Sequence, residues 1–394
     1  MRRLLCFLLL LIPVLSACTT SGTTQALPSP TASTSTPNSP SSTPSPLVEA
    51  SIPGLRLPAG FQISAYARDL EQPRFMTQGP GNTLLVANRG ANAVVALVPG
   101  SDPTKAARSQ TVVQGLHDPT SLDMHNGYLY IGENTSIARV KLDADLHAGP
   151  VERIISLPGG GQHITRTVLI GPDERIYVGI GSTCNVCEED DPHRAAVWVY
   201  NLDGSQGRLF AKGLRNAVGL AINPWNQQIW ATNNGRDLLG DNTPPETVYH
   251  LMDQGDYGWP HCHAGTIPDP EFGQSADACQ GVQQPLVKMQ AHSAPLGLAF
   301  PPPEQKQFPT AYRDSLYIAF HGSWNRSTPT GYKVVRVPLN NGQVAGAAED
   351  FLTGFLQDNG SVTGRPAGVV FAADGTLFVS DDAHGTIYHI WYKG

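Results

Sequence analysis

The chain has 394 residues, of which 26 are Lys or Arg, 33 are Asp or Glu, 40 are Gly and 33 are Pro. The low charged fraction of 15% and the many turn-forming residues argue against helical bundles and coiled coils and favour an all-β chain. The net charge is −7 and there is no Lys/Arg-rich block, so we expect a small-molecule partner and no nucleic acid.

The N-terminal segment has the features of an export signal. Residues 1–17 contain two arginines, an apolar run over 4–15 that is too short to span a bilayer, and then small residues. Leu15-Ser16-Ala17-Cys18 resembles the lipobox of bacterial lipoproteins, which predicts lipidation of Cys18; an ordinary secretory signal is the alternative. Residues 18–47 are rich in Ser, Thr and Pro and carry no charge, which predicts a disordered tether. We therefore expect an exported bacterial lipoprotein, membrane-anchored and facing the periplasm or the cell exterior, with its folded body over 48–394.

Export also determines how the remaining cysteines are interpreted. Four cysteines in an oxidising compartment most simply form two disulfides, and proximity favours the pairs Cys184–Cys187 and Cys262–Cys279. Glu188 follows the Cys-x-x-Cys sequence where a covalent haem site needs a histidine. A zinc site remains a weaker alternative, because the two pairs lack zinc-ribbon spacing.

One pattern recurs along the folded body: a Pro or polar turn, a short apolar strand, a Gly/Asp/Asn turn, an aromatic-rich strand and a third strand. Its six copies begin near residues 73, 119, 165, 216, 295 and 366, and each strand is expected to alternate apolar and polar residues over four to six positions. Six such units predict a six-bladed β-propeller of four-stranded antiparallel blades, with an ordinary β-sandwich as the alternative. Residues 61–70 resemble an extra strand that completes the last blade after 387–390 and closes the ring.

Polar residues occur at matching positions of the repeats. His163 follows a glycine run just before a strand, Arg215 and Asn216 occupy the same point of the next repeat, and a third polar loop covers 233–237. Equivalent positions of a propeller lie at the same height, so these groups are expected to converge at the mouth of the central channel. Sequence is inserted over 233–284 and 320–364, and insertions of this kind often form the binding face. A base, a cation and an amide together suit an anionic planar cofactor or a sugar, with calcium as a further candidate.

At these motifs the sequence resembles the soluble quinoprotein glucose/sorbosone dehydrogenases, most closely the sorbosone dehydrogenase-like or pyranose dehydrogenase branch. The resemblance covers almost all of 52–392, in the family's order. The segments that carry it are 57–61 (Leu-Pro-Ala-Gly-Phe), 162–173, 213–219 (Gly-Leu-Arg-Asn-Ala-Val-Gly), 233–237 (Asn-Asn-Gly-Arg-Asp), 255–260 (Gly-Asp-Tyr-Gly-Trp-Pro) and 364–368 (Gly-Arg-Pro-Ala-Gly).

The resemblance implies pyrroloquinoline quinone (PQQ) bound at the top of the propeller, with calcium at its quinone and carboxylate oxygens. His163 would take the proton from the anomeric hydroxyl of the sugar while hydride passes to C5 of PQQ. Arg215 would stabilise the charge that develops on the quinone oxygen. The alternatives from the residues alone are a loop-supporting role for His163 and a strand-end salt bridge for Arg215.

The remaining family positions map onto three segments, 213–219, 233–237 and 364–368. Asn216 and Asn234 would contact the cofactor, and Gly235 and Arg236 would bind calcium through their backbone carbonyls. Arg365 matches an arginine that binds a cofactor carboxylate, for which its bidentate geometry is suited.

Other positions depart from the family pattern. Residues 321–326 occupy about the region of the family's cofactor-binding lysine, for which His321 or Arg326 is expected to substitute, and Trp324 is a candidate stacking residue, with packing as the alternative. Ser182 stands where glucose-oxidising members have an Asp that orients the base, and Arg236 stands where a Pro is usual.

The sequence thus predicts a PQQ- and calcium-dependent dehydrogenase of an aldose, a pyranose or a sorbosone-like aldehyde, with an unidentified electron acceptor. A calcium-dependent lactonase-type propeller is one alternative, for which Glu133, Asp237, Asp381 and Asp382 are the nearest carboxylates. A non-catalytic ligand-binding propeller is the other alternative.

Overall fold

The computed structural model describes residues 46–394, which consist mainly of strands and loops. The predicted signal peptide, the lipidation site Cys18 and the tether up to residue 45 lie outside the described residues. Within the described part, the first strand, β1 (Leu47–Glu49), pairs antiparallel with β2 (Arg56–Pro58). Within 46–394, no helix is both long enough and apolar enough to cross a membrane.

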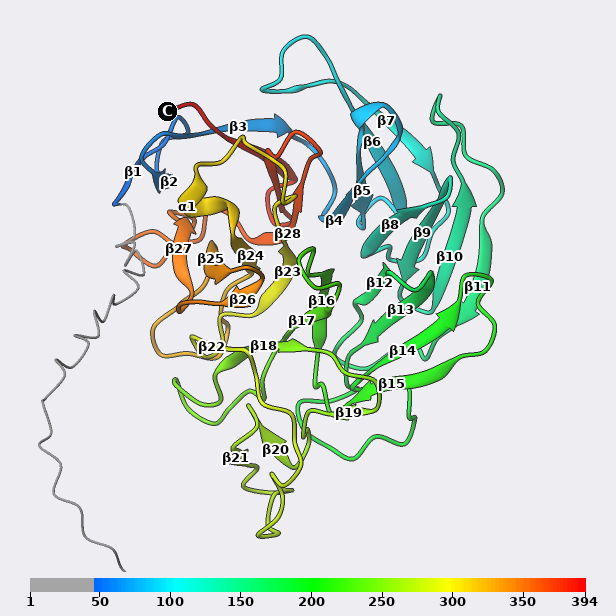
Figure 1. Cartoon of the computed structure of the whole chain (residues 1–394), viewed down its shortest axis with the longest axis vertical. Coiled ribbons are helices and arrows are strands. Elements are labelled where there is room, and N and C mark those ends of the chain that lie inside the picture. The colour runs from blue at the N-terminus through cyan, green and yellow to red at the C-terminus, as the bar shows by residue number, and fades with distance from the viewer. Residues whose placement is uncertain (1–45) are drawn as a thin grey trace, which may run out of the picture. The chain divides into compact units, whose positions relative to one another are not determined.

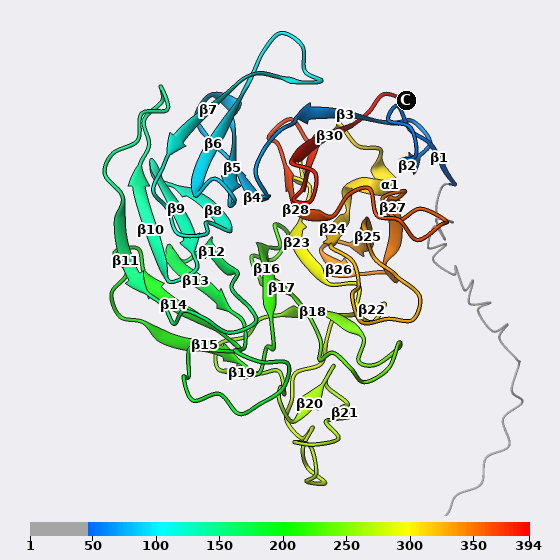
Figure 2. The same cartoon turned by 180° about the vertical axis from the view of Figure 1, so that it is seen from behind.

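Six antiparallel sheets surround a common centre, which confirms the predicted six-bladed β-propeller (Figures 1 and 2). Within each of the first five sheets, the strands follow chain order from the innermost to the outermost. The first three blades comprise β4 (Pro73–Gln78), β5 (Leu84–Asn88), β6 (Ala93–Pro99) and β7 (Ala106–Val113); β8 (Ser121–His125), β9 (Tyr128–Glu133), β10 (Ser136–Lys141) and β11 (Glu152–Ser156); and β12 (Arg166–Ile170), β13 (Arg175–Ile180), β14 (Ala196–Asn201) and β15 (Arg208–Lys212).

The next two blades carry the longer connections. The fourth blade contains β16 (Ala217–Ile222), β17 (Ile229–Asn233), β18 (Glu246–His250) and β22 (Val287–Met289). The fifth contains β23 (Pro295–Ala299), β24 (Ser315–Phe320), β25 (Lys333–Asn340) and β27 (Glu349–Leu352), with β26 (Gln343–Val344) paired to the end of β25. The helical segments of the described chain are short, namely η1 (Pro80–Asn82) and α1 (Thr310–Arg313).

The sixth blade joins the two ends of the folded body. It consists of β28 (Pro366–Phe371), β29 (Leu377–Asp381), β30 (Thr386–Tyr392) and, as its outer strand, β3 (Phe61–Ala67). β3 pairs antiparallel with β30, with Ile63 opposite Ile390, so the predicted closing strand is confirmed. This pairing removes an exposed edge and ties the chain into a ring.

The hydrophobic core is divided among the contacts between blades. Six clusters of buried side chains each combine residues of two neighbouring blades, and the last of them joins the sixth blade to the first. Middle strands are therefore covered on both faces, and every residue of β5, β24 and β29 is buried. The predicted alternation of apolar and polar residues is wrong for these strands, because a blade inside the ring has no solvent-facing side.

Both predicted disulfides are present. Cys184–Cys187 lies in the loop between β13 and β14, and Cys262–Cys279 spans 17 positions of the long insertion between β18 and β22. The insertion adds β19 (Gly255–Asp256) as a parallel outer strand on β15, and then forms the hairpin of β20 (Cys262–His263) and β21 (Ile267–Pro268). The insertion of the fourth blade thus lies against the third blade.

Candidate functional site

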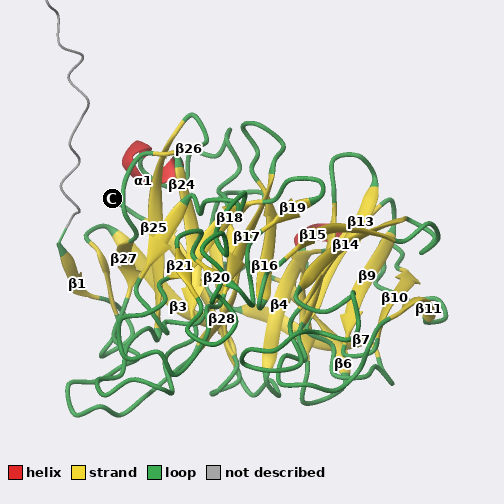
Figure 3. Cartoon of the chain, turned by 90° about the horizontal axis from the view of Figure 1, so that it is seen from below, coloured by secondary structure: helices red, strands yellow, loops and turns green. Residues whose placement is uncertain are grey.

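The predicted site residues gather on one face because neighbouring strands alternate in direction. In each blade, the loop that enters the first strand and the loop between the second and third strands lie at the same end of the antiparallel strands (Figure 3). All predicted catalytic, cofactor and metal residues occur in these loops: His163 precedes β12, Arg215 and Asn216 precede β16, Asn234, Gly235 and Arg236 follow β17, His321, Trp324 and Arg326 follow β24, and Arg365 precedes β28.

A cavity of about 300 Å³ lies among these loops. Its lining brings together six residues that the sequence predicts, namely His163, Arg215, Asn216, Asn234, Gly235 and Trp324. It also includes Gln162, Asp237, Glu246, His292, Ala294 and Asn325, which the sequence analysis did not assign to a cofactor site. Asp237 lies in the polar loop after β17, and Glu246 begins the next strand, β18, so that loop was a signal for these two residues.

His163 is held as a neutral imidazole whose Nε2 has no hydrogen-bond partner among the described residues. Its Nδ1 lies 2.9 Å from the carbonyl oxygen of Ser182 and 3.0 Å from the Ser182 hydroxyl. A carbonyl can only accept, so Nδ1 carries the proton and Nε2 keeps a lone pair. Burial, reinforced by the positive charges of Arg215, Arg194 and Arg166, lowers the pKa of His163 to about 3. The side chain is therefore uncharged near neutral pH and can accept a proton at Nε2.

Ser182 does more than replace a carboxylate. Its hydroxyl donates to the carbonyl of Cys184 at 2.6 Å, and its backbone N–H donates to the carbonyl of Arg215 at 2.8 Å. The residue thereby connects the His163 ring to the loop of the first disulfide and to the next repeat. The orientation of His163 rests on a backbone carbonyl, which carries no full negative charge.

Arg215 is a buried cation with a single carboxylate partner. Its Nη2 lies 2.7 Å from Oδ2 of Asp237, and the guanidinium also donates to Asn185 and to the Asn234 carbonyl. Burial lowers the pKa of Arg215, and the negative charge of Asp237 opposes this effect. The predicted alternative of a salt bridge at a strand end is thus real in the structure, but the same side chain also lines the cavity.

Two carboxamides and a buried carboxylate also line the cavity. Asn216 Nδ2 donates to Asn234 Oδ1 at 3.1 Å, and Asn234 Nδ2 donates to the Pro295 carbonyl at 2.7 Å. Glu246 accepts from the backbone N–H groups of Gly235 at 2.8 Å and of Ala294 at 3.2 Å. Burial raises the pKa of Glu246 to about 7 despite these two hydrogen bonds.

The side chain of Arg236 is directed into the insertion of the fourth blade. Its guanidinium contacts Asp269 and Glu271, and Asp269 also bonds Nε2 of His263 at 2.7 Å. The buried Asp269 and the exposed Glu271 thus neutralise the Arg236 guanidinium, which accounts for an arginine at this position of the loop. Because the Arg236 side chain is engaged in these ion pairs, only its backbone carbonyl is considered as a calcium ligand.

Three other predicted cofactor residues lie outside the lining of this cavity. His321 Nε2 is 2.9 Å from Asp382 Oδ1, and Arg74 binds the other oxygen of Asp382 at 2.5 Å. Burial lowers the pKa of His321. Arg365 donates from Nε to the His321 carbonyl at 3.2 Å.

Arg326 bonds the backbone carbonyls of Asp241 and Ala291. It therefore braces two loops, whereas Trp324, two residues earlier, is 72% exposed at the cavity. Although the two residues share one loop, Trp324 lines the cavity whereas Arg326 holds neighbouring loops together.

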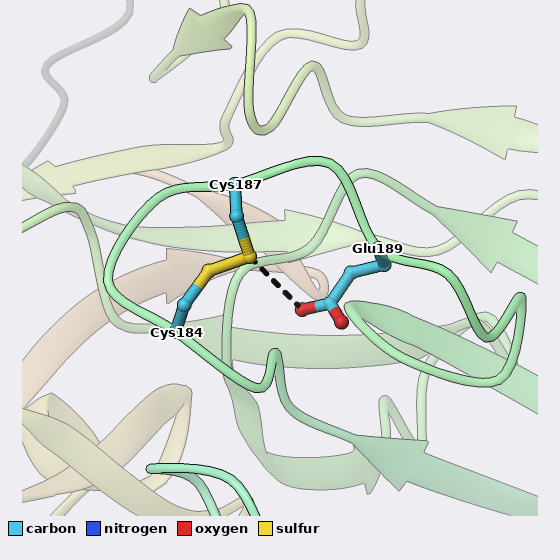
Figure 4. A group of neighbouring side chains, drawn as sticks. All are labelled: Cys184, Cys187 and Glu189. Carbon is cyan, nitrogen blue, oxygen red and sulfur yellow. Dashed lines mark hydrogen bonds between the residues drawn. A yellow bond between two sulfur atoms is a disulfide. The ribbon is translucent and has the colours of Figure 1, made fainter.

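The group of Cys184, Cys187 and Glu189 has the spacing of a metal site but not its chemistry (Figure 4). The two sulfurs form a disulfide, so neither is a thiolate that could bind a metal. Glu189 instead accepts from the backbone N–H and the hydroxyl of Thr183, at 2.6 and 2.8 Å. The weaker zinc alternative is therefore wrong for this pair.

Comparison with known proteins places this architecture in a family. An uncharacterized protein of Borreliella burgdorferi is 28% identical over 356 residues, which cover 86% of this chain and 91% of that protein. A pyrroloquinoline quinone-dependent pyranose dehydrogenase of Coprinopsis cinerea is 27% identical over 405 residues, covering 84% of this chain and 54% of that protein, so the chain spans about half the length of that enzyme.

A solved structure agrees with these relatives. The holo form of the pyranose dehydrogenase PQQ domain from Coprinopsis cinerea superposes with a TM-score of 0.74 at 25% identity, covering 86% of this chain and 97% of that domain. The resemblance inferred from the motifs is confirmed. The family model described as TrAA12-like matches residues 55–393, and the chain belongs to this family.

Proposed function

We propose that the chain is a PQQ-dependent sugar dehydrogenase that oxidises a pyranose or another aldose at its anomeric carbon, with calcium beside the cofactor. The relatives support oxidoreductase chemistry with a quinone cofactor. The observation that carries the proposal is the free Nε2 of neutral His163 in a cavity that also contains a buried guanidinium.

The charge distribution around the cavity fits an anionic cofactor such as PQQ, which is a flat tricarboxylate with an ortho-quinone. Behind the His163 loop, Arg166 and Arg194 are buried, and their guanidinium hydrogen bonds within residues 46–394 go to backbone carbonyls alone. Two cations without a bonded carboxylate favour a negatively charged ligand nearby. A further atom of the lining, Oδ1 of Asn325, is buried without a partner among the described residues and could accept a hydrogen bond from a sugar hydroxyl.

The donor set also fits calcium. This ion prefers oxygen ligands, and Gly235, Asp237 and Glu246 supply carbonyl and carboxylate oxygens along one part of the lining. The backbone carbonyls of Gly235 and Arg236 would hold the ion. Asp269 and Glu271 neutralise the Arg236 guanidinium, so its positive charge would repel a calcium ion less than an unpaired arginine would.

The protein groups divide the work of the reaction. When bound, PQQ would accept the hydride from the anomeric carbon of the sugar. His163 Nε2 would accept the proton of the anomeric hydroxyl, and the Ser182 carbonyl would hold the imidazolium through Nδ1. An anion beside Arg215 would raise the pKa of His163 from its low value and so strengthen this base. Arg215 would stabilise developing negative charge with the N–H that its protein partners leave unused.

The carboxylates considered for a lactonase do not converge on the cavity. Asp237 lines it, but Glu133 is bonded by Arg153 and Ser136 in the second blade. Asp382 is bonded by His321 and Arg74. Hydrolysis is therefore the less favoured function.

A dye-linked assay tests the proposal. The purified chain is incubated with PQQ and calcium, freed of unbound cofactor, and mixed with a panel of aldoses, pyranoses and sugar lactones and a redox dye. Dye reduction with at least one sugar, abolished when PQQ is omitted, is the expected result. Lactone hydrolysis without dye reduction would contradict it, as would failure to retain PQQ.

A further inference from the structure

The loop closed by the Cys184–Cys187 disulfide makes hydrogen bonds to two residues of the cavity lining, Arg215 and Asp237. Asn185, inside this loop, accepts from Arg215 twice: its backbone oxygen accepts from Nε at 2.9 Å and its Oδ1 accepts from Nη2 at 2.9 Å. Asn185 also bonds Asp237, accepting from its N–H at 2.8 Å and donating from Nδ2 to its carbonyl at 3.1 Å. One side chain thus holds both partners of the buried ion pair.

These bonds select which part of Arg215 faces the ligand. A guanidinium has five N–H donors. Asn185 takes one from Nε and one from Nη2, Asp237 takes the other on Nη2, and the Asn234 carbonyl takes one on Nη1 at 3.4 Å. One Nη1–H has no acceptor among the described residues, and Arg215 lines the cavity. The hydrogen bonds to Asn185, Asp237 and Asn234 therefore leave one Nη1–H of Arg215 to donate to a bound ligand.

The same disulfide loop supports the base. The Cys184 carbonyl accepts the hydroxyl of Ser182, and that serine holds His163 through its own carbonyl. The insertion of the fourth blade adds a further contact, because Trp259 Nε1 lies 3.3 Å from the Asn185 carbonyl. The base and the cation are thus positioned from one four-residue segment closed by a disulfide.

We propose that Asn185 is a positioning residue for Arg215, and that the Cys184–Cys187 disulfide keeps its loop in the working arrangement, so that reduction of this bond lowers activity. The inference rests on the proposed function, which it deepens. It does not follow from the Cys-x-x-Cys spacing, which by itself indicates only a bridge.

Reduction needs an external dithiol. One thiolate of the dithiol attacks a cysteine sulfur, the S–S bond breaks and a mixed disulfide forms. The second thiol then releases the protein, so that two electrons and two protons end on the two cysteines. Both cysteines of the first bridge are partly exposed, whereas the second bridge joins the fully buried Cys262 to the partly exposed Cys279, so limited treatment should reduce the first bridge faster than the second.

The first experiment separates positioning from stability. Asn185→Leu keeps the size of the side chain and removes its polar atoms, and we expect kcat to fall about 10- to 100-fold, as for a misplaced catalytic group. Asn185→Asp keeps an acceptor for Arg215 and should recover much of kcat. Asn223→Leu is the control for the loss of side-chain hydrogen bonds, since the Asn223 side chain makes two of them, is more deeply buried than the partly exposed Asn185, and lies at the far end of β16. A similar kcat loss in the control, or full activity of Asn185→Leu, would overturn the proposal.

The second experiment reduces the Cys184–Cys187 disulfide and measures its effect both on turnover and on amide hydrogen exchange. After limited dithiol treatment, alkylation and mass spectrometry verify that Cys184 and Cys187 alone are reduced. We expect kcat to fall and to return on reoxidation, whereas a Cys262→Ser/Cys279→Ser variant keeps this sensitivity. Hydrogen exchange at the amides of Ser182 and Asp237 should accelerate on reduction and in Asn185→Leu, even in protein without cofactor.

The hydrogen-exchange measurement distinguishes failure of the proposed dehydrogenase function from failure of the positioning role of Asn185 and the Cys184–Cys187 disulfide. If the oxidised chain oxidises no sugar, the proposed function fails, and exchange alone decides the positioning role. Unchanged exchange and unchanged kcat after complete reduction of Cys184–Cys187 would refute it.

Discussion

The Arg215–Asp237 pair allows a sharp test, because a structural salt bridge and a catalytic cation predict different behaviour in a double mutant. The Arg215 side chain is 4% exposed and that of Asp237 is 18% exposed, so Arg215→Met leaves a mostly buried carboxylate without its cation. Removal of one partner from a buried pair costs about 3–5 kcal/mol. We expect about 3 kcal/mol in the free energy of unfolding, since Asp237 keeps the amide of Asn325 at 3.0 Å.

Adding Asp237→Asn to Arg215→Met removes the stranded charge. Urea unfolding, followed by tryptophan fluorescence, should show that the double variant regains part of the lost stability. Turnover should not return, because loss of one preorganised donor to developing charge costs ~10²–10³-fold in kcat. Both quantities are measured on the same preparations with saturating PQQ. A double variant that regains near-normal turnover along with its stability would refute the catalytic role of Arg215.

Four further changes follow from the structure. His163→Ala should lower kcat by roughly 10²–10⁴-fold with PQQ affinity largely intact, as seen in stopped-flow reduction and in a binding titration; near-normal turnover would move the base elsewhere. Trp324→Ala should weaken PQQ binding yet leave the free energy of unfolding within about 0.5 kcal/mol, because the ring is 72% exposed; unchanged PQQ affinity would argue against stacking. Burial lowers the pKa of His389 to about 4, so the unfolded chain binds more protons between pH 4 and 6.5, and stability should be lost as pH falls through this range. His389→Phe should lose less stability there in urea titrations, and identical pH profiles of the two proteins would contradict this. Cys18→Ser should release the protein from membranes on fractionation, since this cysteine is the predicted lipid anchor; full retention would disprove it.

The fold could be predicted because each blade repeats the same short pattern. Six copies and an unmatched strand at 61–70 were enough to predict the ring and its closure by β3 against β30. The alternation within strands was predicted wrongly, because neighbouring blades bury both faces of β5, β24 and β29. Solvent exposure of a strand depends on packing between blades, which a repeat pattern does not describe.

The site was predictable where motif and repeat position agree, as for His163, Arg215 and Asn216. Other contacts depend on insertions whose paths are not periodic. The Arg236 side chain meets Asp269 only because the insertion of the fourth blade folds back along β15. Asn185 was missed because its contacts to Arg215 and Asp237 join separate loops, and the cysteines on either side suggested only a bridge.

The proposed function requires that the cavity beside His163 hold a quinone that takes two electrons from a sugar. The most direct measurement is a single turnover without oxygen or dye, in which PQQ-loaded protein is mixed with one equivalent of the best sugar and its absorbance is followed. We expect stoichiometric reduction of the bound cofactor in the natural protein, and binding without comparably fast reduction in His163→Ala. Bound cofactor that no sugar reduces, or equal rates in the two proteins, would contradict it.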